Sequence, residues 1–190
     1  MNKKPGKKRK PSARSNKNQT KQILNIMLRY FILIIAGFSN LWIFYSIFAP
    51  LTINLTNFLL SLFFDSSIVG NVITLSNCCP IEIIDACIAS SAYYLLLIFN
   101  LSTPNILLKK RIKMIVLAFA AFFILNTLRI FLLGVLFVSG SVFFDATHKL
   151  FWYIISTIFV VGIWFAEVKI FRIKEIPFYS DLNWIYKKIK

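Results

Sequence analysis

The stretch MIVLAFAAFFILNTLRIFLLGVLFV, residues Met114–Val138, decides the fold of this chain. It contains one charged residue, Arg129, and its other side chains are apolar or uncharged. Uncharged, apolar runs of about 18 residues or more can cross the hydrocarbon core of a bilayer as a helix. We therefore predict that Met114–Val138 is a transmembrane helix.

Three further apolar runs predict membrane spans on both sides of this stretch. They are Tyr30–Ala49, Ala86–Leu108 and Leu150–Val168. Pro50 is expected to end the first of them, and Pro104 predicts a kink near the inner end of the second, because proline removes a backbone hydrogen bond. Leu51–Phe64 has only about 14 residues, too few for an easy crossing, and predicts an interfacial or re-entrant helix.

The composition excludes a soluble globular domain. Hydrophobic residues make up 58% of the 190 residues and charged residues only 15%, whereas soluble domains have about 25% charged residues. The predicted spans also use most of the chain, which leaves no room for a second domain. The expected fold is an all-α polytopic membrane protein with about four transmembrane helices, and residues 23–170 form the integral membrane domain.

Basic residues gather beside the predicted spans. Residues 1–22 carry nine Lys and Arg and no acid, Lys109–Lys113 forms a second cluster, and residues 171–190 form a basic tail. Such clusters predict cytoplasmic segments and attract anionic lipid. We therefore expect a disordered tail over residues 1–22, both termini in the cytoplasm, Arg29 at the inner edge of the first span, and membrane lipid rather than nucleic acid as the partner of the net charge of +15.

The segment Asp65–Ala86 is predicted to lie on the outer side of the cell membrane. It contains three acids and no Lys or Arg, and cytoplasmic loops are the ones enriched in basic residues. Within this segment, Val72–Leu75 and Ile81–Ile84 flank a turn-forming stretch, which predicts a short extracytoplasmic β-hairpin. The adjacent Cys78 and Cys79 fall in this turn and are open to three interpretations: metal ligands, a redox pair, or filling of the hairpin.

Polar groups inside the spans identify a candidate site. Arg129 lies in the outer half of the third span, and a charged group within a span is costly enough that it usually marks function or a buried partner. Asn126 lies one turn earlier on the same helix face. Cys87 starts the second span and His148, the only histidine, precedes the fourth, so the topology places all of them at the outer side.

These residue types suit nucleophilic catalysis. Cys87 is the candidate nucleophile, since a thiolate attacks carbonyl carbon. His148 is expected to act as general base and acid, and Arg129, held by Asn126, to stabilise the thiolate or an oxyanion.

Two acids support these residues. Asp85 is placed to cap the second span, and Asp145 to orient His148 or to cap the fourth span. Taken singly, each candidate also has an ordinary structural reading, for example a small buried hydrophobe for Cys87.

The motifs Cys87-Ile88-Ala89, Asn126-Thr127-Leu128-Arg129-Ile130 and His148, on successive spans, resemble the exosortase/archaeosortase family, and the small chain is similar to its shorter archaeal members. The resemblance covers roughly residues 69–165. It implies a polytopic membrane transpeptidase with Cys87, Arg129 and His148 as catalytic residues, and no cofactor or metal. One departure is that Ile88-Ala89 follows the cysteine, where the family usually has Ser-Gly.

The resemblance also implies a substrate. Exported proteins with a C-terminal sorting signal, which consists of a short motif, a hydrophobic helix and a basic tail, would be cut on the outer face and transferred to an acceptor, often thought to be a lipid. Two enzyme outcomes stay open, transfer and simple hydrolysis. Two alternatives are not enzymatic: a small transporter or assembly subunit that binds an anion through Arg129, and a scaffold whose basic tails bind acidic lipid or nucleic acid.

Overall fold

The computed structural model describes residues 13–38, 41–76, 79–173, 177 and 186, with the backbone alone for residues 13–22. Four helical stretches in it are long and apolar enough to cross a membrane, namely Trp42–Ser61, Asp85–Ser102, Leu108–Val138 and Phe144–Ile170. A three-stranded antiparallel sheet accompanies them. The prediction of an all-α polytopic membrane protein with about four spanning helices is therefore confirmed.

The described elements follow one another as a broken helical path, a small sheet and three further helical crossings. In chain order they are α1 (Ala13–Phe38), α2 (Trp42–Ser61), β1 (Ser66–Val69), β2 (Val72–Leu75), β3 (Cys79–Glu82), α3 (Asp85–Ile88), α4 (Ser90–Ser102), α5 (Leu108–Val138), α6 (Phe144–Leu150), the π-helical turn η1 (Phe151–Ile155) and α7 (Ser156–Ile170).

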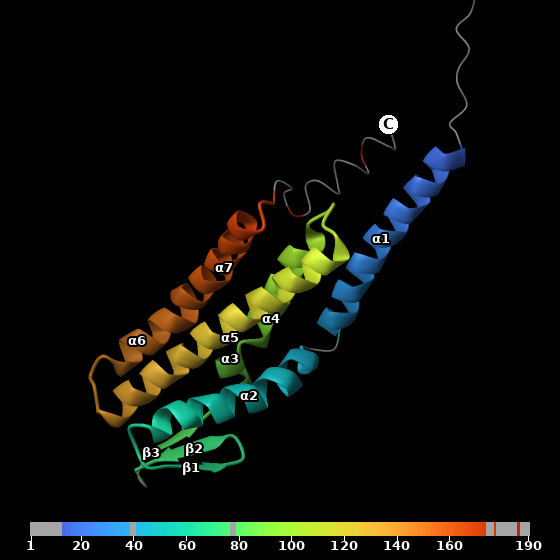
Figure 1. Cartoon of the computed structure of the whole chain (residues 1–190). Coiled ribbons are helices and arrows are strands. Elements are labelled where there is room, and N and C mark those ends of the chain that lie inside the picture. Colours follow the sequence, from blue (N-terminus) through green and yellow to red (C-terminus); the bar gives the residue numbers. More distant parts are fainter. Residues whose placement is uncertain (1–12, 39–40, 77–78, 174–176, 178–185, 187–190) are drawn as a thin grey trace, which may run out of the picture.

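The bundle has two distinct ends (Figure 1). The sheet end carries β1–β3 and the connection between α5 and α6. The basic end carries the start of α1, the connection between α4 and α5, and the end of α7, where Lys109, Lys110 and Lys169 lie. Helix α1 thus begins, and helix α7 finishes, at the same end of the bundle.

The first crossing differs from its predicted bounds. The sequence placed it at Tyr30–Ala49, with a short separate helix over Leu51–Phe64, but the chain bends earlier. Leu41 has a left-handed backbone (φ 60°, ψ 10°), and α2 then runs on through Pro50. Proline is tolerated inside membrane helices because neighbouring groups satisfy the carbonyl that it frees. In Figure 1, α1 and α2 form two segments of one path from the basic end to the sheet end.

The start of α1 also differs from the prediction for residues 1–22. The backbone is helical from Ala13 onward, while residues 1–12 lie outside the described part of the chain. The stretch from residue 13 to residue 22 includes Arg, Lys and Gln, which are good helix formers. Most of the predicted basic tail, residues 171–190, likewise lies outside the described residues.

The predicted β-hairpin is present, but its second strand is Cys79–Glu82 and not Ile81–Ile84, so Cys79 belongs to the strand and not to the turn. The sheet also has an additional strand. β2 pairs with β3 so that Ile73 faces Ile81, and β1 pairs with β2 so that Val69 faces Val72. The two-residue connection between β1 and β2 is Gly70-Asn71, and Gly70 has φ 60°. Glycine followed by Asn is a hairpin turn signal because the first turn residue needs a positive φ. The sequence contained this signal, and the prediction missed β1.

The sequence predicted that Pro104 kinks a helix, but the helix ends just before it. α4 finishes at Ser102, and Thr103 is extended (φ −87°, ψ 118°). The residue before a proline is pushed toward extended conformations because the proline ring clashes with a helical backbone there. The second crossing, Asp85–Ser102, has 18 residues and consists of the short helices α3 and α4 with Ala89 between them.

Two arginines bind the carbonyl groups that the end of α4 leaves free. The Arg111 guanidinium donates to Asn100 O (2.9 Å), Leu101 O (2.9 Å) and Thr103 O (2.7 Å). Arg29 of α1 donates to Leu101 O (3.0 Å) and Thr103 O (3.1 Å). Both side chains are buried. Arg29 meets the end of α4 beside the basic cluster, and Arg111, expected within a cytoplasmic loop, is instead in the first turn of α5. Cations near helix C-termini are favourable because the carbonyl ends carry partial negative charge.

A second buried polar contact joins α4 to α7. Asn100 Nδ2 donates to Glu167 Oε2 at 3.0 Å and to Leu96 O at 3.1 Å. Glu167 is only 1% exposed. Because unpaired polar groups are costly in a bilayer, this contact helps to specify how α7 docks on α4.

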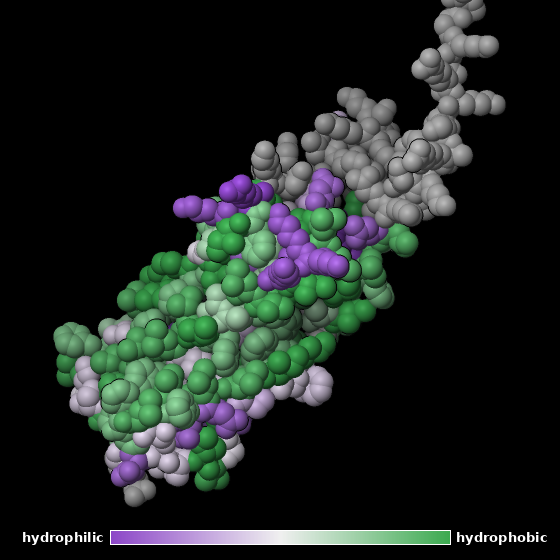
Figure 2. Space-filling view, in the orientation of Figure 1, coloured by the Kyte–Doolittle hydropathy of each residue, from purple (hydrophilic) through white to green (hydrophobic). Residues whose placement is uncertain are grey.

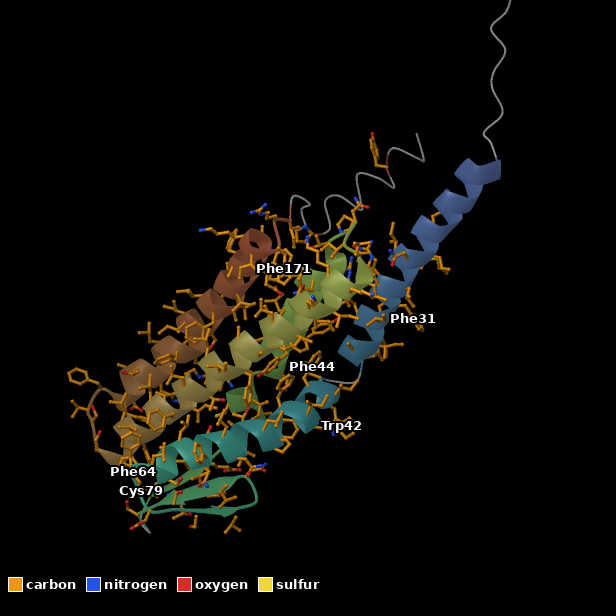
Figure 3. All side chains as sticks on the ribbon, in the orientation of Figure 1. Phe31, Trp42, Phe44, Phe64, Cys79 and Phe171 are labelled. Carbon is orange, nitrogen blue, oxygen red and sulfur yellow. The ribbon has the colours of Figure 1, made fainter. Side chains whose placement is uncertain are left out.

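Two apolar clusters hold the helices together on either side of the junction between α3 and α4. The first is aromatic: the rings of Phe48 and Tyr93 stack with centroids 3.8 Å apart, and Phe44 meets Phe119 edge-on. Figure 3 labels Phe44 on α2, where it points toward the other helices of the bundle. The second cluster joins α2 and α5 to the sheet through buried isoleucines and leucines, among them Leu60, Ile73, Leu75, Ile83, Ile88 and Ile130.

The surface agrees with a membrane environment. Large apolar side chains are exposed along the helices, and Figure 2 shows hydrophobic residues covering the length of the bundle between polar residues at the two ends. In water such a surface would be a large interaction patch. Together with the four apolar crossings, it identifies a multi-pass membrane protein.

Candidate active site

Cys87 lies in α3, a single helical turn that directly follows the sheet. Its backbone N–H donates to Ile84 O at 2.8 Å, and its half-buried side chain packs against the second apolar cluster. Asp85 was predicted to cap this helix. It is instead the exposed first residue of α3, Ile84 is the N-cap, and no side-chain cap bond is formed. An acid in the first turn still has a favourable charge there.

A left-handed residue separates α3 from α4. Ala89 has φ 56° and ψ 47°, and it is both the C-cap of α3 and the N-cap of α4. This conformation favours glycine, because a Cβ atom is strained in it. Ala89 adopts this conformation although it is not glycine.

Asn126 holds the turn that contains Cys87. Its Nδ2 donates to Cys87 O at 2.8 Å, and Ile88 O lies at 3.5 Å. The break at Ala89 leaves these carbonyls without helical donors, and a buried amide from α5 satisfies them. The sequence predicted that Asn126 would hold Arg129. The two residues do share a helix face, but Asn126 binds the backbone of α3.

Arg129 lies one turn beyond Asn126 and is 6% exposed. One guanidinium nitrogen donates to Ser156 Oγ at 2.7 Å, and Nε has no hydrogen-bond partner among the described residues. The backbone position of Arg129 is three residues after Asn126, whose side chain holds the Cys87 carbonyl at 2.8 Å. The structure thus links the Cys87 turn to the face of α5 that carries both Asn126 and Arg129.

Ser156 is a site residue that the sequence analysis missed. It begins α7, and its hydroxyl both accepts from Arg129 and donates to Phe151 O at 2.7 Å. The only signal in the sequence is that Ser156 is one of few polar residues within the run Leu150–Val168. Nothing in that run indicates that this hydroxyl, and not the adjacent Thr157, would meet Arg129.

A cavity of about 630 Å³ opens beside Arg129. It lies between the first turn of α2 on one side and η1 and α7 on the other, with α3 and the start of α4 between them. Its walls include Trp42, Tyr45, Asp85, Ala89, Arg129, Trp152 and Ser156. Neither Cys87 nor His148 is among the residues that line it. The cavity thus presents a cation, hydroxyl groups and aromatic rings within the membrane part of the bundle.

His148 is not in contact with the other candidate residues. Its ring stacks on Phe144 (5.7 Å between centroids) and meets Trp152 edge-on (5.8 Å). It precedes Ser156 by eight residues, about 12 Å along a helix. No hydrogen bond connects it to Cys87, Arg129 or Asp145 within the part of the chain that the structure describes. It is linked to the cavity through Trp152.

Asp145 neither orients the imidazole nor caps the helix through its side chain. It is exposed in the first turn of α6, whose N-cap is Phe143. Among the described residues, no group of three or more His, Cys, Asp or Glu could hold a metal ion. Cys79 opens β3 at the outermost part of the sheet end (Figure 3), and Cys78 lies outside the described residues.

Comparison of the chain with protein families, with curated proteins and with solved structures finds no match. What the site can do is therefore inferred from its own geometry and from the motifs described above.

Proposed function

We propose that this protein is a membrane cysteine transpeptidase of the exosortase/archaeosortase type, with Cys87 as its nucleophile. One observation carries the proposal: Asn126 holds the Cys87 backbone at 2.8 Å, one helical turn from the buried Arg129. A thiol and a cation are thereby held together near the sheet end of a membrane bundle. A nearby cation stabilises the thiolate, which is the reactive form of cysteine.

The proposed reaction has two steps. The Cys87 thiolate attacks the carbonyl carbon of a peptide bond, the C–N bond breaks, and the leaving amine takes a proton from His148, which had received the thiol proton. An acceptor hydroxyl or amine then gives its proton to His148, attacks the thioester carbon and releases Cys87. Arg129 stabilises the negative charge of the thiolate and of each tetrahedral intermediate.

In this mechanism His148 must approach the reacting atoms when substrate is bound. Catalytic hydrogen bonds are often long or poorly aligned in structures without substrate and tighten only in the complex. The contact of His148 with Trp152, which lines the cavity, is consistent with a site that substrate completes.

The proposed substrates are exported proteins with a C-terminal sorting signal, and the acceptor is a nucleophile such as a membrane lipid. The basic residues at one end of the bundle favour a cytoplasmic location for that end and for both termini. The sheet end and the active site would then face outward. The hydrophobic helix of the signal would pack against the exposed apolar helices of the bundle.

The decisive experiment co-expresses a tail-bearing substrate with wild-type protein or with Cys87→Ala. Cleavage is expected with the wild type and should be absent with Cys87→Ala, while Cys78→Ala and Cys79→Ala should still cleave. Normal processing by Cys87→Ala would show that the nucleophile assignment is wrong. Mass measurement of the new C-terminus separates transfer, which adds the acceptor, from hydrolysis, which adds water.

A second candidate function is a small transporter or assembly subunit that binds an anion through Arg129. It is favoured by the cavity, which Arg129 lines and Cys87 does not. In this case Arg129→Gln should abolish function and Cys87→Ala should leave it intact. A cysteine enzyme would lose function with either substitution, so Cys87→Ala separates the two candidates.

A further inference from the structure

The hydrogen bonds of Ser156 determine which way its hydroxyl points. Oγ lies 2.7 Å from Phe151 O and 2.7 Å from a terminal nitrogen of Arg129. A carbonyl oxygen only accepts and a guanidinium only donates. The Ser156 proton therefore goes to Phe151, and the Ser156 oxygen must accept from Arg129. Ser156 is therefore a donor in one of these hydrogen bonds and an acceptor in the other.

The π-helical turn η1 places Ser156 in this position. Its backbone N–H and its hydroxyl both donate to Phe151 O, five residues earlier. A π turn contains one more residue than an α turn and thus changes which side chains of the following helix face inward, and such turns are frequent at functional sites. Here the extra residue lies in the helical stretch that joins His148 to α7.

The acceptor that Arg129 uses is neutral. No carboxylate forms a hydrogen bond or ion pair with Arg129 in the described part of the chain, and the bond that it does make is to a hydroxyl. A hydroxyl satisfies one guanidinium N–H without cancelling its charge, whereas a carboxylate would pair with it. The positive charge is therefore not cancelled by a carboxylate, one helical turn beyond the Asn126 side chain that holds the Cys87 carbonyl at 2.8 Å.

We propose that Ser156 is a positioning residue, which holds the Arg129 guanidinium through a neutral bond so that its charge serves the Cys87 thiolate. This inference rests on the proposed function, because it assigns Arg129 the task of activating Cys87. It adds a requirement to that function: residue 156 must accept a hydrogen bond and must not carry a negative charge.

The test measures alkylation of Cys87 by iodoacetamide at one fixed pH, in detergent-solubilised full-length protein that carries Cys78→Ala and Cys79→Ala. Ser156→Ala should slow alkylation about tenfold, the effect of losing a hydrogen bond to a charged group. Ser156→Thr should restore the rate, and Ser156→Asp should slow it at least as much as Ser156→Ala, because an ion pair neutralises Arg129. The other charged groups on β3 and α3, Glu82 and Asp85, are exposed and unchanged in these variants.

Two controls separate positioning from damage to the fold. Ser139→Ala removes a hydroxyl that binds a carbonyl of the helix it follows, Leu136 O at 2.9 Å. This variant should alkylate at the reference rate, which is the rate of the protein that carries only Cys78→Ala and Cys79→Ala. In an Arg129→Gln background, Ser156→Ala should have no further effect, because the residue acts through Arg129. Melting temperatures identify any variant that is simply unfolded.

The proposal is overturned if Ser156→Ala and Ser156→Asp alkylate at the reference rate while Arg129→Gln is slow, since Arg129 would then act without Ser156. It is also overturned if Ser156→Asp alkylates faster than Ser156→Ala. Failure of the enzyme proposal looks different: Cys87→Ala would still process substrate, whatever the alkylation rates of the Ser156 variants.

Discussion

The side-chain amide of Asn126 on α5 and the backbone carbonyl of Cys87 on α3 are joined by a 2.8 Å hydrogen bond that spans 39 residues of sequence. This bond fixes the turn that carries the candidate nucleophile to the helix that carries Arg129. Asn126 is only 1% exposed, so water cannot readily replace it as the donor.

Replacement of Asn126 should therefore damage both stability and activity. Asn126→Leu leaves the Cys87 carbonyl without its buried donor, and such a loss typically costs about 1–3 kcal/mol of unfolding free energy. The cleavage rate of Asn126→Leu should fall even where the variant stays folded, because α3 is then free to move relative to α5. Unfolding in mixed micelles and the cleavage assay measure the two effects.

A second variant at this position tests the hydrogen bond and not the volume. Asn126→Asp has almost the same size but an ionised carboxylate has no N–H to donate. It should lose cleavage as Asn126→Leu does. Wild-type cleavage by both variants would show that the bond to Cys87 is dispensable.

Ala89→Gly should stabilise the protein. Ala89 adopts φ 56° and ψ 47° at the junction of α3 and α4, where glycine avoids the strain on Cβ, so we expect a gain of about 1 kcal/mol in unfolding free energy. The matched control is Ala120→Gly, at an exposed position inside α5, which should lose about 1 kcal/mol. Equal destabilisation by both substitutions would contradict a left-handed Ala89.

The contact between Asn100 and Glu167 should show strong coupling in a double-mutant cycle. Asn100→Leu alone removes the donor to Glu167 Oε2 (3.0 Å). The buried Glu167 carboxyl group then lacks this hydrogen bond, which should lower the unfolding free energy by about 3 kcal/mol. The double variant Asn100→Leu/Glu167→Leu removes both partners and should be less destabilised than Asn100→Leu, because no orphaned polar group is left. Additive losses in unfolding free energy would argue against the contact.

Arg111→Lys should not behave as a conservative substitution. The Arg111 guanidinium reaches three carbonyl oxygens at the end of α4, and the single ammonium of lysine lacks the planar fork that makes these bonds. We expect a loss of about 2 kcal/mol in unfolding free energy. The control is Lys113→Arg, at an exposed position two residues further along α5, and it should leave the unfolding free energy unchanged. A neutral Arg111→Lys would mean that the carbonyls find other donors.

Span number, membrane class and the location of the polar candidates follow from the sequence, because they depend on local properties. The run Met114–Val138 is apolar whatever it packs against, and the basic clusters mark one end of the bundle in any arrangement. The pairing of Val72–Leu75 with the segment around Ile81 is also local, since few residues separate the two strands. The choice of Cys87 and Arg129 as neighbours came from the same combination of depth and order.

Only the tertiary structure decided which polar groups meet. Pro50 looked like a helix end, but the chain bends at Leu41, because packing of α2 against α5 outweighs one lost hydrogen bond. Asn126 binds Cys87 O, Arg111 is buried against α4, and Ser156 meets Arg129 across 27 residues. The reason is geometric: a hydrogen-bond partner depends on helix rotation and register, and the π turn before Ser156 resets both in a way that no spacing in the sequence reveals.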